Sequence, residues 1–312
     1  MDEDKYQALL AAEASFWDQQ IPDIPGFRPD IQYLGTHVQV DPSQVEEIWD
    51  DPKVESIARG PLRERIYTIL ETGPGSRVLE LGCGFGWLAV ELARRGFHVK
   101  GIDISPRRIA IAEAYARVLA SALNGGSLEY EMADLNRLCL EPESLDGVVA
   151  WDCLHHMVDI EHVIGEVTKA LRPGAPLLAF ESLREPGQVG RFFYSVFHLI
   201  LPTREPYCQK LPSFRAMHSR ITGDSGPSRV FSSLLSPLDG YTGYNMMDTI
   251  RRYLEIREMV WKFAFCGPLL GRLRGGRLRF ALVRAVERFD TATLKLRLLP
   301  GTHVFVHAVK PK

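Results

Sequence analysis

The 312-residue sequence has few cysteines, no long hydrophobic run and almost no net charge. Its five cysteines are odd in number, scattered and never spaced as CxxC, so neither a disulfide framework nor a zinc finger is expected. The most apolar run, residues 192–201, is shorter than the about 20 residues that a membrane-spanning helix needs. The formal net charge of −2 gives no general attraction to nucleic acid, so no nucleic-acid partner is expected.

A secretion signal is also missing from the start of the sequence. Met1 to Lys5 are mostly acidic, whereas a signal peptide opens with basic residues and an apolar core. Together with the scattered cysteines, this predicts reduced thiols and a cytoplasmic location. The charge is unevenly spread: residues 1–60 hold 13 acidic and 4 basic side chains, and residues 251–300 hold 12 basic and 4 acidic ones.

What is present is a glycine-rich turn after a short apolar strand. Val78 to Leu81 ends abruptly, and helical spacing begins at 88–93. Glycines stand at alternate positions between the two, at Gly82, Gly84 and Gly86. They allow left-handed backbone and let a ligand lie close to the chain, and the helix start offers N–H groups to it. The pattern predicts a strand, a tight turn and a helix that bind a nucleotide-like cofactor.

Glu80, two positions before the first glycine, narrows the choice of cofactor. The dinucleotide fingerprint spaces its glycines G-x-G-x-x-G, whereas the spacing here is G-x-G-x-G. A carboxylate beside a phosphate is repulsive, but beside a sulfonium and an ammonium it is attractive. The stretch resembles motif I, E-x-G-x-G-x-G, of the class I S-adenosylmethionine (SAM) methyltransferases. An ordinary βα turn and a nicotinamide site remain the alternatives for this turn alone.

Two aspartates follow the next two expected strands. Asp103 comes 21 residues after Gly82, a spacing that places its carboxylate within reach of a ribose diol. Asp134 ends the third strand, where the resemblance implies an acceptor for the adenine amino group. Each could instead cap a turn or helix. The resemblance then implies a SAM site made of Glu80, Gly82, Cys83, Gly84, Gly86, Asp103, Ile104, Asp134, Leu135 and Trp151.

The fourth strand leads into a loop, residues 152–159, with two adjacent histidines. It resembles the L-H-H stretch of a methyltransferase group that includes ubiquinone-biosynthesis enzymes, in which this loop faces the methyl group. Methyl transfer rests mainly on positioning, but a hydroxyl acceptor must also lose a proton, which a neutral histidine can take near pH 7. His155 and His156 are therefore the candidate catalytic bases, with His156 slightly favoured and a structural tether as the alternative. No metal is expected, although Asp152 and Asp159 flank these histidines.

Short apolar strands alternate with amphipathic helices from residue 77 on, which predicts an α/β fold with a parallel sheet covered on both faces. The expected strands are 77–81, 98–103, 127–133, 145–151, 175–182 and 303–309. The expected helices are 5–19, 61–71, 86–95, 106–123, 160–171, 192–199, 249–265 and 278–299. In the family, the doubly wound sheet has seven mainly parallel strands, and the last strand is an antiparallel edge strand.

The chain divides into four expected parts. They are an N-terminal helical lid segment (1–75), the SAM-binding Rossmann-like core (76–182), a largely helical, substrate-selecting insertion (183–295) and the closing edge strand (296–312). The insertion mixes arginines with large apolar side chains in residues 261–297, so it either packs as a helical lid or touches an anionic membrane surface peripherally. The resemblance covers 76–182 and the closing strand, and leaves the substrate-selecting parts uncovered.

The resemblance implies a SAM-dependent methyltransferase that acts on a small-molecule or lipid-like acceptor, with O-methylation slightly preferred. DNA methylation is not expected, because Trp151 to Leu154 replaces the N-P-P-Y type of tetrapeptide after the fourth strand. Two alternatives remain open. One is a SAM-fold protein that does not methylate, such as a cyclase, a pericyclase or a binding module. The other, less favoured, is a nicotinamide-dependent oxidoreductase.

Overall fold

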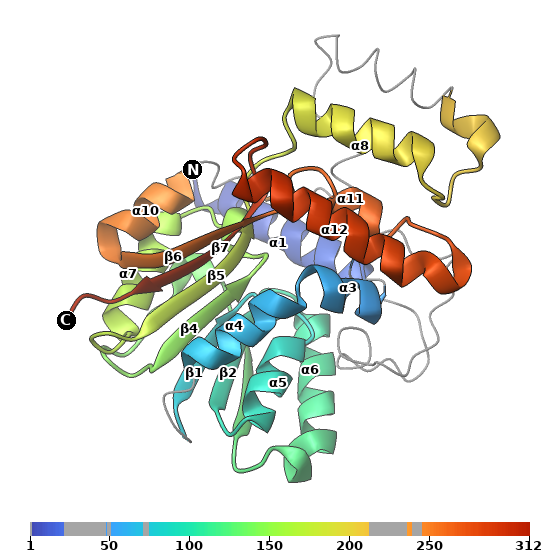
Figure 1. Cartoon of the computed structure of the whole chain (residues 1–312). Coiled ribbons are helices and arrows are strands. Elements are labelled where there is room, and N and C mark those ends of the chain that lie inside the picture. Colours follow the sequence, from blue (N-terminus) through green and yellow to red (C-terminus); the bar gives the residue numbers. More distant parts are fainter. Residues whose placement is uncertain (1, 22–47, 49–50, 71–74, 212–235, 239–244) are drawn as a thin grey trace.

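A seven-stranded sheet forms the centre of the computed structural model, which describes residues 2–21, 48, 51–70, 75–211, 236–238 and 245–312 (Figure 1). The strands lie in the order β3-β2-β1-β4-β5-β7-β6. β1 to β5 are parallel, and β7 is antiparallel to both of its neighbours. The strands are β1 (Arg77–Leu81), β2 (His98–Asp103), β3 (Ser127–Met132), β4 (Gly147–Trp151), β5 (Pro176–Ser182), β6 (Glu255–Lys262) and β7 (His303–Val309). The predicted mainly parallel, seven-stranded α/β sheet is confirmed.

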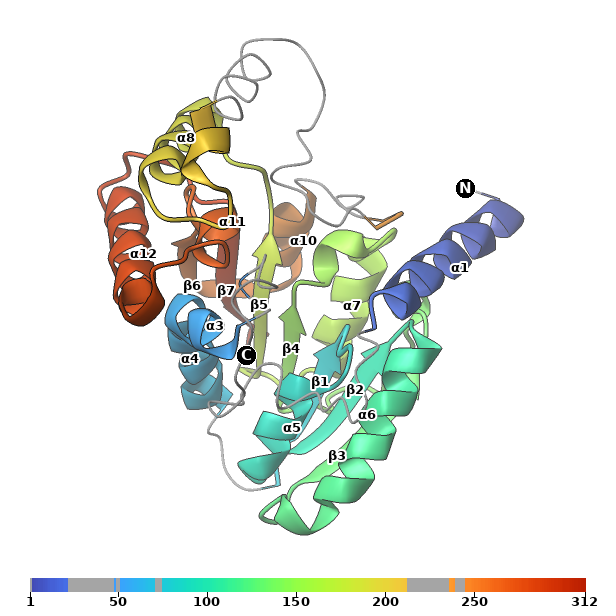
Figure 2. The ribbon, with the colours of Figure 1, turned by 90° about the vertical axis from the view of Figure 1, so that its right-hand side faces the viewer.

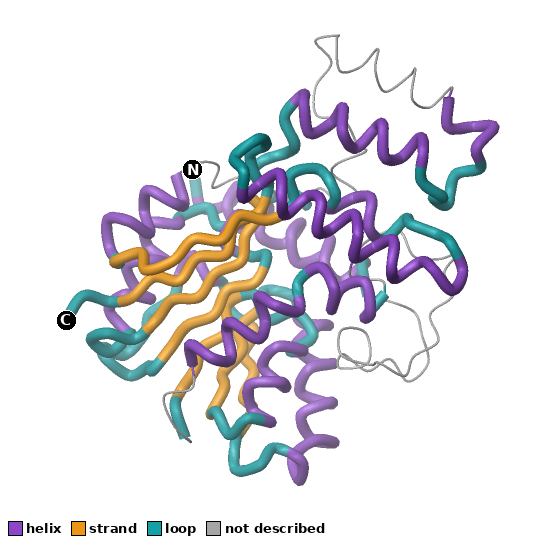
Figure 3. The backbone as a smooth tube through the Cα atoms, viewed as in Figure 1, coloured by secondary structure: helices purple, strands orange, loops and turns teal. Residues whose placement is uncertain are grey.

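Helices cover both faces of this sheet (Figures 2 and 3). On β4, Val149 and Trp151 join the core under α4, α5, α6 and α12, while Val148 and Ala150 join the core under α7 and α10. This alternation is the period of two that a strand buried on both faces requires. The helices of these two layers are α4 (Gly60–Leu70), α5 (Trp87–Arg94), α6 (Pro106–Leu119), α12 (Arg279–Lys295), α7 (Ile160–Ala170) and α10 (Asn245–Tyr253).

The prediction of one long helix over 249–265 is wrong. Helix α10 ends at Tyr253, and β6 follows as the true edge strand, paired with β7. Consequently β7 is not the edge strand that the sequence predicted, and α10 and β6 belong to the sheet domain rather than to a continuous insertion from 183 to 295. A register shift between Ile256 and Glu258 breaks the two-residue period of β6, which explains why the sequence pattern concealed the strand.

The sequence also missed a short helix, α3 (Pro52–Ala58), which lies outside all of the expected helices. Asp51 caps this helix by accepting the backbone N–H groups of Lys53 and Val54, and Pro52 occupies its first turn. The same Asp51 also binds Arg279 at 2.6 Å, and both side chains are buried. This ion pair joins α3 to α12. Most of the residues in 20–50 and 202–246 lie outside the described residues.

A second helical layer stands beyond one end of the sheet (Figure 1). It contains α8 (Gln188–Ile200), α11 (Gly267–Leu270) and α12. Phe193 and Phe197 of α8 pack against Phe265, with ring centroids 5.6 and 5.1 Å apart, and against Phe289 of α12. Helix α1 (Glu3–Gln19) lies on the other side, next to α6 (Figure 2). None of the helices in the described part of the chain is long and apolar enough to cross a membrane.

Candidate functional site

The glycine-rich turn joins β1 to α5 at the point where the order of the sheet strands reverses. Gly82, Gly84 and Gly86 have φ values of 62°, 53° and 74°, which are left-handed. A Cβ atom at Gly82 would collide with Cys153, and one at Gly86 would collide with the Tyr130 ring. Both the backbone conformation and the close neighbours therefore require glycine here. A reversal point of this kind is where α/β sheets bind ligands, outside the carboxyl ends of their strands.

Glu80 lies buried beneath this turn. Its Oε2 accepts the backbone N–H of Ala89 in the first turn of α5 at 2.9 Å. Burial raises the pKa of Glu80 to about 8, and the negative charge of Asp103 contributes in the same direction. A cation placed near this carboxyl group would favour its ionised form. The residue thus both fixes the turn and suits a positively charged ligand.

Asp103 ends β2 with its carboxylate held by main-chain groups. Its Oδ2 accepts the N–H of Gly84 and its Oδ1 accepts the N–H of Ser105, each at 2.8 Å. Burial raises the pKa of this carboxyl group, against the opposing charge of Arg108. Ser105 in turn caps α6. Asp103 therefore links the glycine-rich turn to the neighbouring helix start, at the carboxyl edge of the sheet.

Helix α1 crosses the same edge. The Tyr6 hydroxyl donates to Asp134 Oδ2 at 2.5 Å, and Asp18 accepts from the Ser105 hydroxyl at 2.5 Å. Asp134 Oδ1 accepts the N–H of Asn136, so Asp134 also has the turn-capping role that its position allowed. Both oxygens of the expected adenine acceptor thus have partners from the protein itself.

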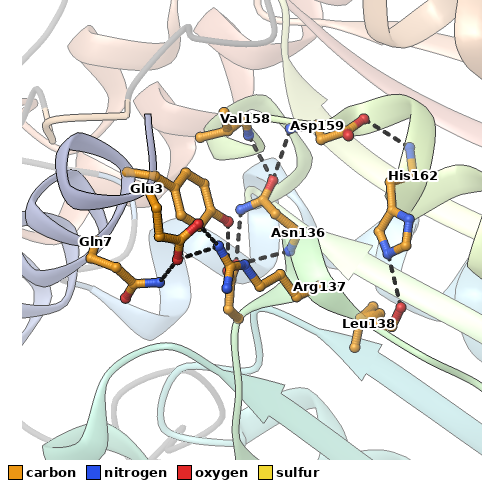
Figure 4. A network of polar contacts seen from close by, with 10 residues as sticks. Glu3, Gln7, Asn136, Arg137, Leu138, Val158, Asp159 and His162 are labelled. Carbon is orange, nitrogen blue, oxygen red and sulfur yellow. Dashed lines mark hydrogen bonds and ion pairs between the residues drawn. The ribbon is translucent and has the colours of Figure 1, made fainter. Parts of the chain in front are cut away.

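A wider polar network holds α1 against the loops that follow β3 and β4 (Figure 4). Arg137 donates to both carboxylate oxygens of Glu3 at 2.6 Å. Asn136 Oδ1 accepts the backbone N–H groups of Val158 and Asp159 at 2.8 and 2.9 Å. Because the network connects three segments, a displacement of α1 would also displace the loop that carries the two histidines, residues 152–159.

The two histidines of that loop occupy different environments. The Nδ1 of His155 lies 2.8 Å from Oε2 of Glu181, which is fully buried at the end of β5. Glu181 Oε1 also accepts the N–H groups of Cys153 and Leu154, at 3.2 and 3.0 Å. An acceptor carboxylate fixes Nδ1 of His155 as the donor, which leaves Nε2 able to accept a proton when the ring is neutral.

His156 is instead buried under α1. Its Nδ1 lies 3.0 Å from the Ser236 hydroxyl and 3.4 Å from Glu13 Oε1, and its ring packs edge-on against Trp17. Burial, and then the nearby charge of His155, lower the pKa of His156 to about 2. A ring that resists protonation so strongly is a poor base, so these contacts shift the preference from His156 to His155.

Arg59 and His303 lie near this loop, and the sequence gave no signal that either is a site residue. Asp152 has a left-handed φ of 51° and pairs with Arg59 at 3.2 Å. Arg59 lies over the Phe180 ring, on which His303 stacks. Burial lowers the pKa of His303 to about 4. In the described part of the chain, no three His, Cys, Asp or Glu side chains come together as a metal ion would need.

Four of the expected cofactor-binding residues pack in or against the hydrophobic core, namely Cys83, Trp151, Ile104 and Leu135. The Cys83 side chain is buried against Gly101, and its backbone N–H donates to Ile102 at 3.0 Å. Trp151 is also buried, with its ring packed against the rings of Trp87 and Phe180. Ile104 packs on the small core under α1, and Leu135 lies in the core on the α7 side. For these four, contact with a cofactor remains a prediction.

Comparison with known proteins gives this geometry a family. Residues 78–174, from β1 to the turn before β5, match the profile of a family described as a methyltransferase domain. The chain contains a class I SAM-dependent methyltransferase domain. The match includes the glycine-rich turn, both aspartates and the histidine loop, and it leaves out α1, α8 and α12.

Relatives of this methyltransferase domain are named O-methyltransferases. A ubiquinone biosynthesis O-methyltransferase from Hahella chejuensis is 36% identical over 114 residues, which is 36% of this chain and 46% of that protein. The O-methyltransferase resE from Aspergillus sclerotiorum is 31% identical over 133 residues, 41% of this chain and 49% of that protein. The chain thus spans about half the length of these curated relatives.

The similarity in fold covers more of the chain than the similarity in sequence does. The crystal structure of a geranyl diphosphate C-methyltransferase from Streptomyces coelicolor A3(2) aligns with a TM-score of 0.53 and 13% identity. The alignment covers 97% of this chain and 98% of that one. At this identity the likeness shows a shared fold and nothing about the acceptor.

Proposed function

We propose that this chain is a SAM-dependent methyltransferase for a small-molecule or lipid-like acceptor, with oxygen as the preferred accepting atom. The names of its relatives support transfer to oxygen. The observation that carries the proposal is Asp103, whose carboxylate is held by Gly84 and Ser105 at the edge where a ribose diol would bind. No nucleic acid is among the proposed partners.

The buried acids at this edge fit the cofactor's charge. Glu80 has a raised pKa because it is buried near Asp103, and a sulfonium or ammonium group would relieve that cost. Glu80, Asp103 and Asp134, with the backbone of the glycine-rich turn and with Ile104 and Leu135, would hold SAM. Bound there, SAM supplies a methyl carbon already activated by its sulfonium. The protein then has to orient the acceptor and remove its proton.

His155 is the proposed base. Glu181 holds its Nδ1, so Nε2 can take the proton of an acceptor hydroxyl as the new bond to oxygen forms. Glu181 positions His155 and also fixes the loop through the N–H groups of Cys153 and Leu154. His156, with its Nδ1 turned to Ser236 and Glu13, would shape the site by packing α1 over the loop.

We also propose a cytoplasmic location. All five cysteines are unpaired, and Cys83, Cys153 and Cys266 are buried. Unpaired thiols suit a reducing compartment.

We also propose the peripheral membrane contact expected of the 183–295 block, because the protein would meet a lipid-like acceptor at a bilayer surface.

Methyl-labelled SAM tests the activity directly. The protein is incubated with it and with an extract of the cells that make the protein, and the labelled product is identified by mass spectrometry. A labelled methyl ether or ester in the presence of wild-type protein, absent with Asp103→Ala, is the expected result. SAM binding without any labelled product would instead favour the non-methylating alternative, a cyclase or binding module.

A further inference from the structure

Helix α8 is apolar on both of its faces. Its inner side packs against Phe265 and against Phe289 of α12 through Phe193 and Phe197, and its Tyr194 is buried. Its exposed side carries Val189, Phe192 and Ile200, which are 57%, 51% and 59% exposed, with the half-buried Val196 between them. We name Val189, Phe192, Val196 and Ile200 the outer stripe. Their spacing of three, four and four residues places them on one side of the helix.

Exposed apolar side chains also stand on and just after the C-terminal half of α12, the helix beside α8. Leu296 and Leu298 are 69% and 67% exposed. Phe289 is 43% exposed, and its ring lies 6.2 Å from Phe193 and 5.3 Å from Phe197 of α8. The two helices therefore lie side by side, as Figures 1 and 2 also show. Exposed apolar surface that continues across two elements is typical of a binding surface.

The exposed charge on the α12 part of this surface is of one sign. Residues 276–300 are all described, and their exposed charged side chains are all basic: Arg277, Arg284, Arg288, Lys295 and Arg297. The two acids in this range are both paired with groups of the protein itself. Glu287 accepts from Lys262 at 2.5 Å, and the buried Asp290 accepts the N–H groups of Ala264, Phe265 and Cys266.

We propose that the outer stripe and the basic C-terminal half of α12 bind the surface of a bilayer that contains anionic phospholipid. Apolar side chains on a helix face enter the boundary between headgroups and acyl chains, while neighbouring arginines and lysines attract the anionic headgroups. A second copy of the chain suits this surface less well, because a two-fold contact would set the basic surface of one copy against the same basic surface of the other.

This surface is only a part of the one that the sequence indicated in residues 183–295. Phe263, Phe265, Leu269, Leu270 and Leu273 are buried in the core. Arg279 is buried as well, bonded to Asp51. We expect the surface to bring the methyltransferase to a lipid-like acceptor, and only this role rests on the proposed function. The binding to vesicles itself requires neither SAM nor acceptor.

Co-sedimentation of the full chain with vesicles tests the inference. The vesicles are phosphatidylcholine alone or phosphatidylcholine mixed with phosphatidylglycerol, at low and at high salt. We expect pelleting with the anionic vesicles that weakens with salt, because the screening length is about 8 Å at physiological ionic strength. Phe192→Ser with Ile200→Ser should lower binding roughly tenfold or more. Arg284→Gln with Arg288→Gln should lower it roughly fivefold per arginine.

Helix α6 offers matched controls in Arg117 and in Val118, which is 71% exposed. Arg117→Gln and Val118→Ser should bind vesicles as the wild type does. A wild-type protein that stays in the supernatant with anionic vesicles at low salt overturns the inference, as does an equal loss in the controls. A lipid-free dimer that Phe192→Ser dissociates would assign the surface to a second copy. Calorimetry with SAM on each variant separates the outcomes, because normal SAM binding without vesicle binding refutes this inference and the membrane contact, and leaves the proposed methyl transfer standing.

Discussion

The two ends of the candidate site are held together in different ways. At the cofactor end, the carboxylates of Glu80 and Asp103 are held by backbone N–H groups of Ala89, Gly84 and Ser105. At the proposed acceptor end, side chains hold the two histidine rings: Glu181 holds His155 and Ser236 holds His156. Main-chain partners are available to any sequence that makes the same turn, whereas side-chain partners are particular to this chain. We therefore expect the cofactor end to carry the common chemistry and the acceptor end to carry the specificity.

The largest expected effect lies at the acceptor end. Replacing His155 with Ala should lower turnover by roughly 10²–10⁴ while SAM affinity stays normal, because the proton acceptor is lost. The labelled-methyl assay measures turnover, and calorimetry measures SAM affinity. His156→Ala is the matched control, with a smaller loss expected. If His156→Ala abolished turnover and His155→Ala did not, the roles assigned to the two rings would have to be exchanged.

At the cofactor end, Asp103→Ala should weaken SAM binding by well over tenfold, since each lost hydrogen bond to a charged group is worth ~1.5–3 kcal/mol. Calorimetric titration gives the affinity, and circular dichroism checks that the fold survives. Glu131→Ala removes an exposed carboxylate from β3, paired with Lys100, and should leave the affinity unchanged. Equal affinities for wild type and Asp103→Ala would remove Asp103 from the site.

The raised pKa of Glu80 predicts a pH dependence of cofactor binding. Its carboxyl group has a pKa of about 8 and so carries a proton at pH 6, while a cationic ligand favours the ionised form. Binding then releases a proton, and SAM affinity should rise with pH by up to about tenfold per unit and level off near the pKa. Calorimetry from pH 6 to 8 measures the slope, and Glu80→Gln should flatten it. A slope that Glu80→Gln leaves unchanged must come from another group.

The smallest expected effect concerns α1, which reaches into the cofactor end. The Tyr6 hydroxyl occupies Asp134 Oδ2, the oxygen that an adenine amino group would use. Tyr6→Phe should therefore strengthen SAM binding by roughly fivefold, the worth of one hydrogen bond of about 1 kcal/mol. Tyr253→Phe loses a similar bond, to Glu161, away from the site and serves as the control. Weaker SAM binding by Tyr6→Phe would show that Tyr6 supports the adenine site instead of competing for it.

The difference between main-chain and side-chain partners also explains which parts of the site the sequence could predict. The turn after β1 was predictable because its determinants are local: the glycines need left-handed φ, and Asp103 accepts from Ser105 two residues away. The partners of the histidine loop were not, because Glu181 lies 26 residues from His155 in the chain and Ser236 lies 80 residues from His156. No spacing rule connects residues that meet only after the sheet has formed.

The prediction of the fold from the sequence was limited in the same way. Regular alternation marked the first five strands, and the antiparallel last strand was expected as well. β6 was missed because its bulge disrupts the period of two and its glutamates, arginine and methionine also suit helices. The buried pair of Asp51 and Arg279, 228 residues apart, shows why arginines of the 183–295 block could not be sorted into surface and core beforehand.

A calorimetric titration of the wild-type protein with SAM, set beside one with a nicotinamide dinucleotide, distinguishes a methyltransferase site from an oxidoreductase site. We expect one SAM site per chain, competed by S-adenosylhomocysteine, and no heat of binding from the dinucleotide. Glu80 beneath the turn and the G-x-G-x-G spacing are the reasons for that selectivity. Binding of the dinucleotide with no response to SAM would contradict the claim and make the chain an oxidoreductase candidate.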